Sequence, residues 1–231
     1  MAVKPSILFI GSQMATGEVQ HILLDQAEWF YQQGYPVTGA FFYDQEGVHQ
    51  AWQQDYPFPI MNLNLYPPGK QTNPLRMLSG LLRLYRFMRR NCFDIVETFT
   101  HHANLLALPL AWLRRIPVRV ASHHGRVANF PPWQDRLHAM VISSAITTCM
   151  VAESEQICSV ATREENIRED KIIVIHNGIW LLPSQPCLLA EPEFRVNLSA
   201  QGKTLVEEKF NRDQMCTQYR NLFENLLERS K

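Results

Sequence analysis

The chain has no excess charge of either sign. Lysine plus arginine and aspartate plus glutamate each number 22 among 231 residues. Domains that bind nucleic acid usually carry a basic excess, so the composition does not indicate a nucleic-acid partner. Hydrophobic residues make up 46% of the chain, as in ordinary globular proteins. The sequence therefore predicts a globular chain of about one or two domains.

Cysteine is also scarce, and none of it forms a metal or disulfide motif. The five cysteines are scattered without a C-x-x-C pair, and no H-x-x-x-H pattern occurs. Neither a zinc site nor a cofactor is therefore expected. A nucleophile elbow and a Walker A sequence are absent as well, so neither of those active sites is indicated. Scattered thiols without a disulfide framework are typical of a cytoplasmic protein.

Long hydrophobic runs are missing too. Near the N-terminus, Ile7–Ile10 is a short apolar run with polar residues close behind it, which does not fit a signal peptide. The longest apolar stretch, Ala103–Leu113, contains Asn104 and Pro109 and is shorter than the ~20 residues that a membrane-spanning helix needs. We therefore expect a cytoplasmic protein without a membrane span.

Apolar strands alternate with helical segments over most of the chain. Strands are predicted at Ser6–Ile10, Val37–Tyr43, Ile60–Leu65, Asp94–Thr98, Pro117–Ser122, Ala145–Val151 and Lys171–Ile175. Helices are predicted at Val19–Gln33, Leu75–Arg90, Asn104–Arg115, Trp133–Ser143 and Glu155–Arg163. This order predicts an α/β fold with a doubly wound, mostly parallel Rossmann-like sheet of about seven strands.

The last strand marks a change in the character of the chain. Ile172–Ile175 is a run of β-branched apolar residues, typical of a strand buried on both faces. Asn177-Gly178 ends it, because both residues readily adopt positive φ. Beyond it come a Pro-broken connector at 180–192 and charged helices at Glu193–Phe210 and Asp213–Arg229. We therefore expect one domain at 1–179 and C-terminal helices at 193–231.

Histidines gather where the predicted strands end. Five of the eight lie just past such a strand, namely His101, His102, His123, His124 and His176. Open α/β sheets bind ligands beyond the carboxyl ends of their strands, and imidazole can act as a base, a hydrogen-bond donor or a metal ligand. A candidate site is therefore expected at this edge of the sheet.

A loop of small and polar residues, Gly11–Glu18, follows the first strand and precedes a helix. This layout points backbone N–H groups at an anion such as a phosphate. Any strand–helix unit also needs a turn of small residues, and two separated glycines do not decide between these interpretations. Both remain open.

The predicted helix at Leu75–Arg90 is basic and amphipathic. Its apolar side carries Leu78, Leu81, Leu82, Tyr85 and Met88. The other side largely carries Arg76, Arg83, Arg86, Arg89 and Arg90. One interpretation is a core helix with a solvated face, and the other is peripheral contact with anionic lipid at the inner face of a membrane.

Four stretches resemble landmarks of the family-4 glycosyltransferases, which have the two-domain GT-B fold. They occur in the order of the family, at Val19–Val37, Phe93–Ala107, Ile116–Gly125 and Lys171–Ile179. The last, K-I-I-V-I-H-N-G-I, is similar to the interdomain signature V-I-x-N-G-[VI]-D, with Trp180 in place of the Asp. The resemblance implies that 1–179 is the amino-terminal, acceptor-side domain.

The end of the chain also resembles such an enzyme. Ala190–Asn211 and the helix after it are similar to its last segment. The second domain of the family, which binds the nucleotide sugar, has no counterpart, because only residues 180–189 join the two parts. The resemblance therefore implies an incomplete glycosyltransferase that moves a sugar from a nucleotide sugar to a glycan or lipid acceptor. The alternatives are a non-catalytic remnant that binds an acceptor or a partner, and an unrelated nucleotide-binding α/β domain.

The resemblance assigns roles to individual residues. His124 matches the histidine at the strand end before the acceptor cleft and is the expected catalytic residue. The residues expected near the acceptor are His101, His102, His123 and Arg126. Those expected at the donor phosphate or the interdomain cleft are Gly11, Gly17, Asn177 and Gly178. Glu18 stands where the family has its second glycine, and its carboxylate would repel a diphosphate. The family is generally metal-independent, so the resemblance implies no metal.

The predicted helix at Asp213–Arg229 carries an apolar stripe. Its members are Met215, Tyr219, Leu222, Phe223 and Leu226, spaced as one helical face. Exposed, these large side chains would favour aggregation. We therefore expect the stripe to pack against the first helices of the α/β domain; the alternative is a detached helix that pairs with another chain.

Overall fold

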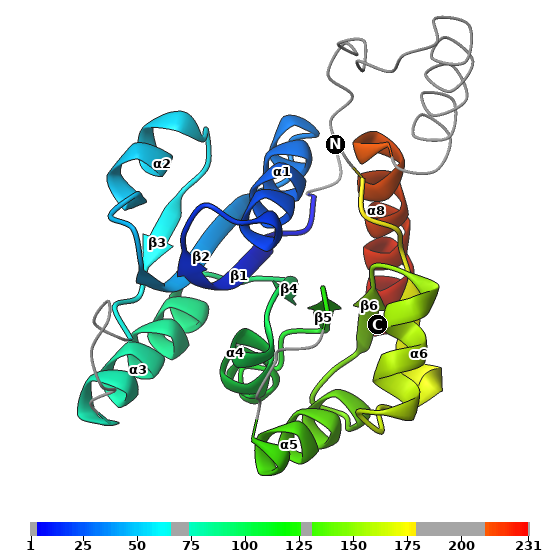
Figure 1. The fold of residues 1–231 in the computed structure, drawn as a ribbon. Helices are drawn as coiled ribbons and strands as arrows, with labels where there is room; N and C mark the ends of the chain where they lie inside the picture. Colours follow the sequence, from blue (N-terminus) through cyan, green and yellow to red (C-terminus); the bar gives the residue numbers. More distant parts are fainter. Residues whose placement is uncertain (1–3, 66–73, 126–130, 179–210, 231) are drawn as a thin grey trace, which may run out of the picture.

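The computed structural model describes residues 4–65, 74–125, 131–178 and 211–230. In these ranges, seven strands form one sheet in the order β3-β2-β1-β4-β5-β6-β7, and all neighbours pair in parallel (Figure 1). The strands are β1 (Ile7–Met14), β2 (Val37–Asp44), β3 (Ile60–Asn62), β4 (Ile95–Thr98), β5 (Val118–His123), β6 (Cys149–Ala152) and β7 (Ile172–Val174). The predicted parallel Rossmann-like sheet is confirmed.

Helices cover both faces of the sheet. On one face lie α1 (Glu18–Gln32), α2 (His49–Asp55) and α8 (Arg212–Arg229) (Figure 1). On the other lie α3 (Pro74–Arg90), α4 (His101–Leu113), α5 (Pro132–Ser143) and α6 (Glu155–Arg163). The chain winds from β1 outward to β3 and then crosses through α3 to β4, so right-handed crossovers place these two sets on opposite faces. None of the helices described here is long and apolar enough to cross a membrane.

Helix α8 covers the half of the sheet that α1 leaves bare. Its Tyr219 and Phe223 belong to the same buried cluster as Val120 of β5 and Val151 of β6. Phe223 also stacks on Phe30 of α1, with ring centroids 5.4 Å apart. The predicted docking near the first helix is therefore confirmed. Four residues of the stripe are at most 9% exposed, namely Met215, Tyr219, Phe223 and Leu226. The fifth, Leu222, packs against the same cluster.

Polar contacts hold the beginning of α8 in place. Asn211 caps the helix, its side chain accepting a hydrogen bond from the N–H of Asp213 at 2.8 Å. The indole N–H of Trp29 in turn donates to Asp213 Oδ1 at 2.9 Å. The predicted connector at 180–192 and the predicted helix at Glu193–Phe210 lie outside the described residues.

Strand β7 corrects the prediction of a strand buried on both faces. It forms an edge of the sheet, pairing with β6 alone among the described strands, and Ile173 is 38% exposed. A run of β-branched residues indicates that a strand is favoured but not where in the sheet it lies.

Three other boundaries differ from the predictions. Strand β1 continues through Gly11 to Met14, still paired with β2. Helix α4 begins at His101, because the Thr100 side chain caps it by accepting a hydrogen bond from Ala103 N. Helix α2, which no pattern predicted, begins where the Asp44 carboxylate accepts hydrogen bonds from the N–H groups of residues 47, 48 and 49. Local capping, rather than apolar periodicity, sets the two helix starts.

The predicted division of α3 into two faces is partly wrong. The buried residues of this helix are Gly80, Leu84 and Met88. Leu75, Leu78 and Leu82 are instead 76%, 54% and 42% exposed. Their spacing leaves an apolar stripe on the outer side of the helix.

Candidate active site

A pocket of about 260 Å³ lies at the carboxyl ends of β1, β4 and β5. The order of the strands reverses between β1 and β4, and open α/β sheets bind ligands at such a switch point. The residues that line the pocket are Val19, Phe99, Thr100, His101, Ser122, His124 and Gly125. The edge of the sheet that the sequence singled out therefore carries a pocket.

His124 is held in one orientation at this pocket. Its ring stacks on Phe99 at 5.7 Å with an interplanar angle of 8°, and its side chain is 5% exposed. Its Nδ1 lies 3.1 Å from Glu153 Oε2, and because a carboxylate accepts, Nδ1 carries the proton. Nε2 is buried, and no described residue forms a hydrogen bond with it. A neutral ring in this orientation presents an Nε2 lone pair, which could accept a proton.

The stretch His176-Asn177-Gly178 supports His124 indirectly. Asn177 Nδ2 donates to Glu153 Oε2, and His176 Nδ1 lies 3.3 Å from the carbonyl oxygen of Glu153. The hydrogen bond from His124 lowers the pKa of Glu153 against the effect of its burial, so this carboxyl is ionised at neutral pH. Asn177 thus acts on the site through Glu153.

Gly178 is required by close packing and not by a positive φ. Neither Asn177 nor Gly178 has positive φ, contrary to the sequence prediction. A Cβ at Gly178 would lie 2.5 Å from Arg212 Cα, at the start of α8. Its N–H points at Met215 Sδ, 3.1 Å away. The glycine therefore lets α8 return against the end of the sheet.

The two glycines expected at a donor phosphate occupy different places. Gly11 is buried within β1, where a Cβ would lie 2.6 Å from the ring of Phe41, so packing explains this residue. Gly17 directly precedes α1 with an extended backbone, φ −159°. Two residues further, Val19 lines the pocket. Gly17 is thus at the edge of the candidate site and Gly11 is not.

The four residues expected near an acceptor are also separated. His101 is 7% exposed and lines the pocket, whereas His102 is exposed on the same helix. His123 is 2% exposed and bonded to Glu165, because successive residues of a strand point to opposite faces and His124 takes the pocket side. Arg126 lies outside the described residues.

A buried histidine cluster lies behind the pocket. Ligand atoms of His101, His138 and Glu165 all lie within 4.8 Å of one another. Burial, and next to it the charge of His101, lowers the pKa of His138 to about 3, so that ring is neutral. No sequence motif pointed to His138 or Glu165, because they come from α5 and from the segment after α6 and meet only in the folded chain.

A second buried polar group lies under α8. Glu97 of β4 is fully buried, and it accepts hydrogen bonds from Ser122 Oγ at 2.6 Å and Gln26 Nε2 at 2.7 Å. The Tyr219 hydroxyl lies 3.3 Å from Ser122 Oγ. Burial raises the pKa of Glu97 to about 8, so this carboxyl is largely protonated at neutral pH. In the sequence, the sign of this buried group is a single Glu within an apolar predicted strand.

The fold and the switch-point pocket define an α/β domain with a candidate ligand site at its strand ends, and comparison with known proteins gives the family. The chain belongs to Glycosyltransferase Family 4, whose family model matches residues 19–181. The resemblance stated from the sequence is therefore confirmed. None of the curated proteins matches the chain.

Solved structures share the fold at low sequence identity. HepE from Anabaena, solved with UDP, matches at TM-score 0.62 and 18% identity over 84% of this chain and 50% of its own. A glycosyltransferase from Rickettsia africae matches at TM-score 0.60 and 16% identity over 86% of this chain and 50% of its own. The lipopolysaccharide outer core galactosyltransferase WaaB matches at TM-score 0.56 and 14% identity over 81% and 50%. The chain thus spans about half the length of these structures.

Proposed function

We propose that this chain is the acceptor half of a family-4 glycosyltransferase and binds the hydroxyl group of a glycan or lipid acceptor beside His124. The observation that carries the proposal is the Glu153–His124 pair at the switch-point pocket. Glu153 holds the Nδ1 proton, so Nε2 is the atom that accepts a hydrogen bond or a proton from the acceptor. Membership of the family supports the reaction class.

The donor side of the proposed reaction is incomplete in this chain. Transfer from a nucleotide sugar needs stabilisation of the leaving diphosphate, usually by cationic side chains and aligned N–H groups. None of the residues lining the described pocket is Lys or Arg. The N-termini of α1 and α4 both attract anions there, and Glu18 opposes the effect of α1. We therefore propose that a second domain or a partner supplies the donor site.

Sugar transfer by the isolated chain should be negligible. The test mixes the chain with labelled UDP-sugars and glycan or lipid acceptors and follows the labelled product. Turnover that His124→Ala abolishes would contradict the missing donor site. Acceptor binding by calorimetry should persist, weaken roughly tenfold in His124→Gln through the lost hydrogen bond, and stay unchanged in the exposed control His21→Gln.

A non-catalytic acceptor-binding protein is the second candidate function, and the lack of Lys and Arg among the described residues that line the pocket favours it. Both candidates predict that the isolated chain binds an acceptor but not UDP, so addition of a donor-binding domain of this family separates them. Sugar transfer by the mixture that His124→Ala abolishes supports the enzyme, whereas acceptor binding without transfer supports the non-catalytic protein. Failure to bind an acceptor would overturn both.

The exposed stripe of α3 suits a lipid acceptor at the inner face of a membrane. Leu75, Leu78 and Leu82 lie on a helix with five arginines and no acidic residue. The chain should therefore sediment with vesicles that contain phosphatidylglycerol and not with neutral phosphatidylcholine. Serine at all three leucines should reduce binding at least tenfold, whereas serine at the exposed Leu113 of α4 should have little effect. Equal sedimentation with both vesicle types would contradict an electrostatic contact.

A further inference from the structure

We propose that His101, His138 and Glu165 bind one divalent transition-metal ion of the zinc class. The three side chains come from α4, from α5 and from the segment after α6. They are 7%, 1% and 6% exposed, and their ligand atoms lie within 4.8 Å of one another. Two imidazoles and one carboxylate are ligands that zinc prefers, whereas magnesium and calcium prefer oxygen alone.

Glu165 is already oriented as a ligand. The N–H of Gly125 donates to His123 Nδ1 at 3.2 Å, so the other ring nitrogen, Nε2, carries the proton and donates to Glu165 Oε2 at 2.9 Å. The second carboxylate oxygen, Oε1, is buried 3.9 Å from His101 Nε2, and no described donor forms a hydrogen bond with it. A buried carboxylate oxygen without a donor is costly, and a metal ion would satisfy it.

Asn104 orients His138, as His123 orients Glu165. The amide Nδ2 lies 3.0 Å from His138 Nε2, and Thr98 Oγ1 lies 2.6 Å from Asn104 Oδ1 and 3.2 Å from the carbonyl oxygen of Val120. The single hydroxyl hydrogen of Thr98 cannot serve both oxygens. The conflict is resolved when the nitrogen and oxygen of the Asn104 side-chain amide exchange places. Thr98 Oγ1 then donates to the Val120 carbonyl oxygen and accepts from Asn104 Nδ2. The amide oxygen of Asn104 now faces His138 and accepts from its Nε2–H. His138 Nδ1 then keeps its lone pair, and metal-binding histidines are commonly held in this way.

The site needs only a small contraction. Tetrahedral zinc with bonds of about 2.0–2.1 Å places its ligand atoms about 3.3 Å apart. The three side chains would therefore approach one another by roughly 1 Å or more, and a water molecule would complete the tetrahedron.

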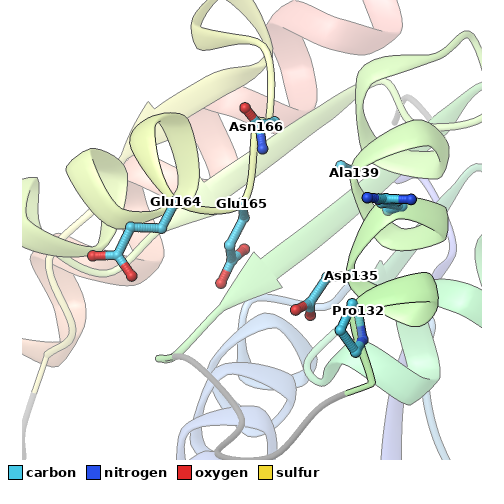
Figure 2. Close-up of a pocket in the computed structure, with 7 residues that line it drawn as sticks. Pro132, Asp135, Ala139, Glu164, Glu165 and Asn166 are labelled. Carbon is cyan, nitrogen blue, oxygen red and sulfur yellow. The ribbon is translucent and has the colours of Figure 1, made fainter.

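A route from solvent to the site lies on the Glu165 side. A pocket of about 360 Å³ is lined by Glu165, Glu164 and Asp135, and Arg136 is the one Lys or Arg among its described lining residues. Figure 2 shows Glu165 and Asp135 on opposite sides of this pocket. Its acidic lining would attract a cation. His101 also lines the pocket that contains His124. A bound metal would therefore fix the His101 ring, which the acceptor of the proposed function would contact.

Zinc binding to the chelator-treated, untagged full chain tests the proposal. Calorimetry should give one zinc ion per chain and no uptake of magnesium, and saturating zinc should raise the melting temperature by several degrees. X-ray absorption of the zinc-loaded protein should show two imidazoles and only nitrogen and oxygen ligands at about 2.0–2.1 Å. A sulfur ligand at about 2.3 Å, or no zinc binding, would overturn the assignment.

Substitutions then locate the ion. Glu165→Gln and His138→Gln should each weaken zinc binding at least tenfold, whereas the variant with the exposed control substitution His21→Gln should bind zinc as the natural chain does. Far-ultraviolet circular dichroism of each metal-free variant checks that it is folded. If a variant fails to fold, the absorption experiment on the natural chain decides. Undiminished binding by both folded variants would refute the site.

Discussion

A chain that ends before α8 should not fold stably. The large apolar side chains that α8 buries are Met215, Tyr219, Phe223 and Leu226. At ~1.5–3 kcal/mol for each, this helix contributes about 6–12 kcal/mol of hydrophobic stabilisation, comparable with the ~5–15 kcal/mol net stability of a domain. Its loss would also expose Val120 and Val151 of the central sheet. Deletion of 211–231 should therefore give an aggregating or molten chain, checked by gel filtration and near-ultraviolet circular dichroism.

A single substitution gives the same test in a soluble protein. Phe223→Ala should lower the free energy of unfolding by about 3–5 kcal/mol, because it leaves a cavity beside Phe30 and Tyr219. Asn225→Ala, on the exposed side of the same helix, should change it by less than ~0.5 kcal/mol. Urea denaturation of both variants measures the difference. Equal stabilities would mean that α8 does not pack on the sheet in solution.

The second large effect concerns Glu97 and pH. Its pKa is raised by burial from 4.5 in an unperturbed chain to about 8 in the fold. The folded state therefore binds more protons than the unfolded state between these values, so this residue makes stability fall as pH rises from 4.5 to 8. The slope reaches about 1.4 kcal/mol per pH unit. Below pH 4.5 and above pH 8 its contribution is constant.

Glu97→Gln should remove this pH dependence. The amide keeps the shape and carries no charge; its oxygen can accept from Gln26 Nε2, and its NH2 group can donate to Ser122 Oγ. At pH 8 to 9 the variant should be more stable than the natural chain by several kcal/mol, and near pH 4.5 the two should agree.

The neighbouring groups do not obscure this comparison. Burial raises the pKa of Cys149 to about 12, that of Cys216 above its usual range and that of Tyr219 well above its usual value, so all three remain neutral. Glu165 and His138 titrate in both proteins and cancel in the difference. Urea denaturation at each pH provides the measurement, and parallel stability curves would show that Glu97 does not titrate in this range.

The sequence alone predicted the sheet and the family. Alternation of apolar strands with periodic helices is a local property, so strands such as Val37–Asp44 and helices such as Pro74–Arg90 were found within a few residues. The stripe of α8 was equally readable, because five large apolar side chains on one helical face must be buried somewhere. Strand ends in a parallel sheet meet at one edge, so the sequence placed His124 at that edge, and the family resemblance made it the predicted catalytic residue.

The tertiary structure alone decided which side chains meet. His123 and His124 are adjacent in sequence, but the pleat sends one to Glu165 and the other to Glu153. Gly11 and Gly178 matched phosphate and cleft motifs, yet each is required by a close neighbour that lies far away in the chain. Partners such as these carry no local sequence signal, because burial and hydrogen bonding depend on segments brought together by folding. The sequence determined that this sheet belongs to Glycosyltransferase Family 4, and the packing of the strand ends in the folded chain decided which residues line its pocket.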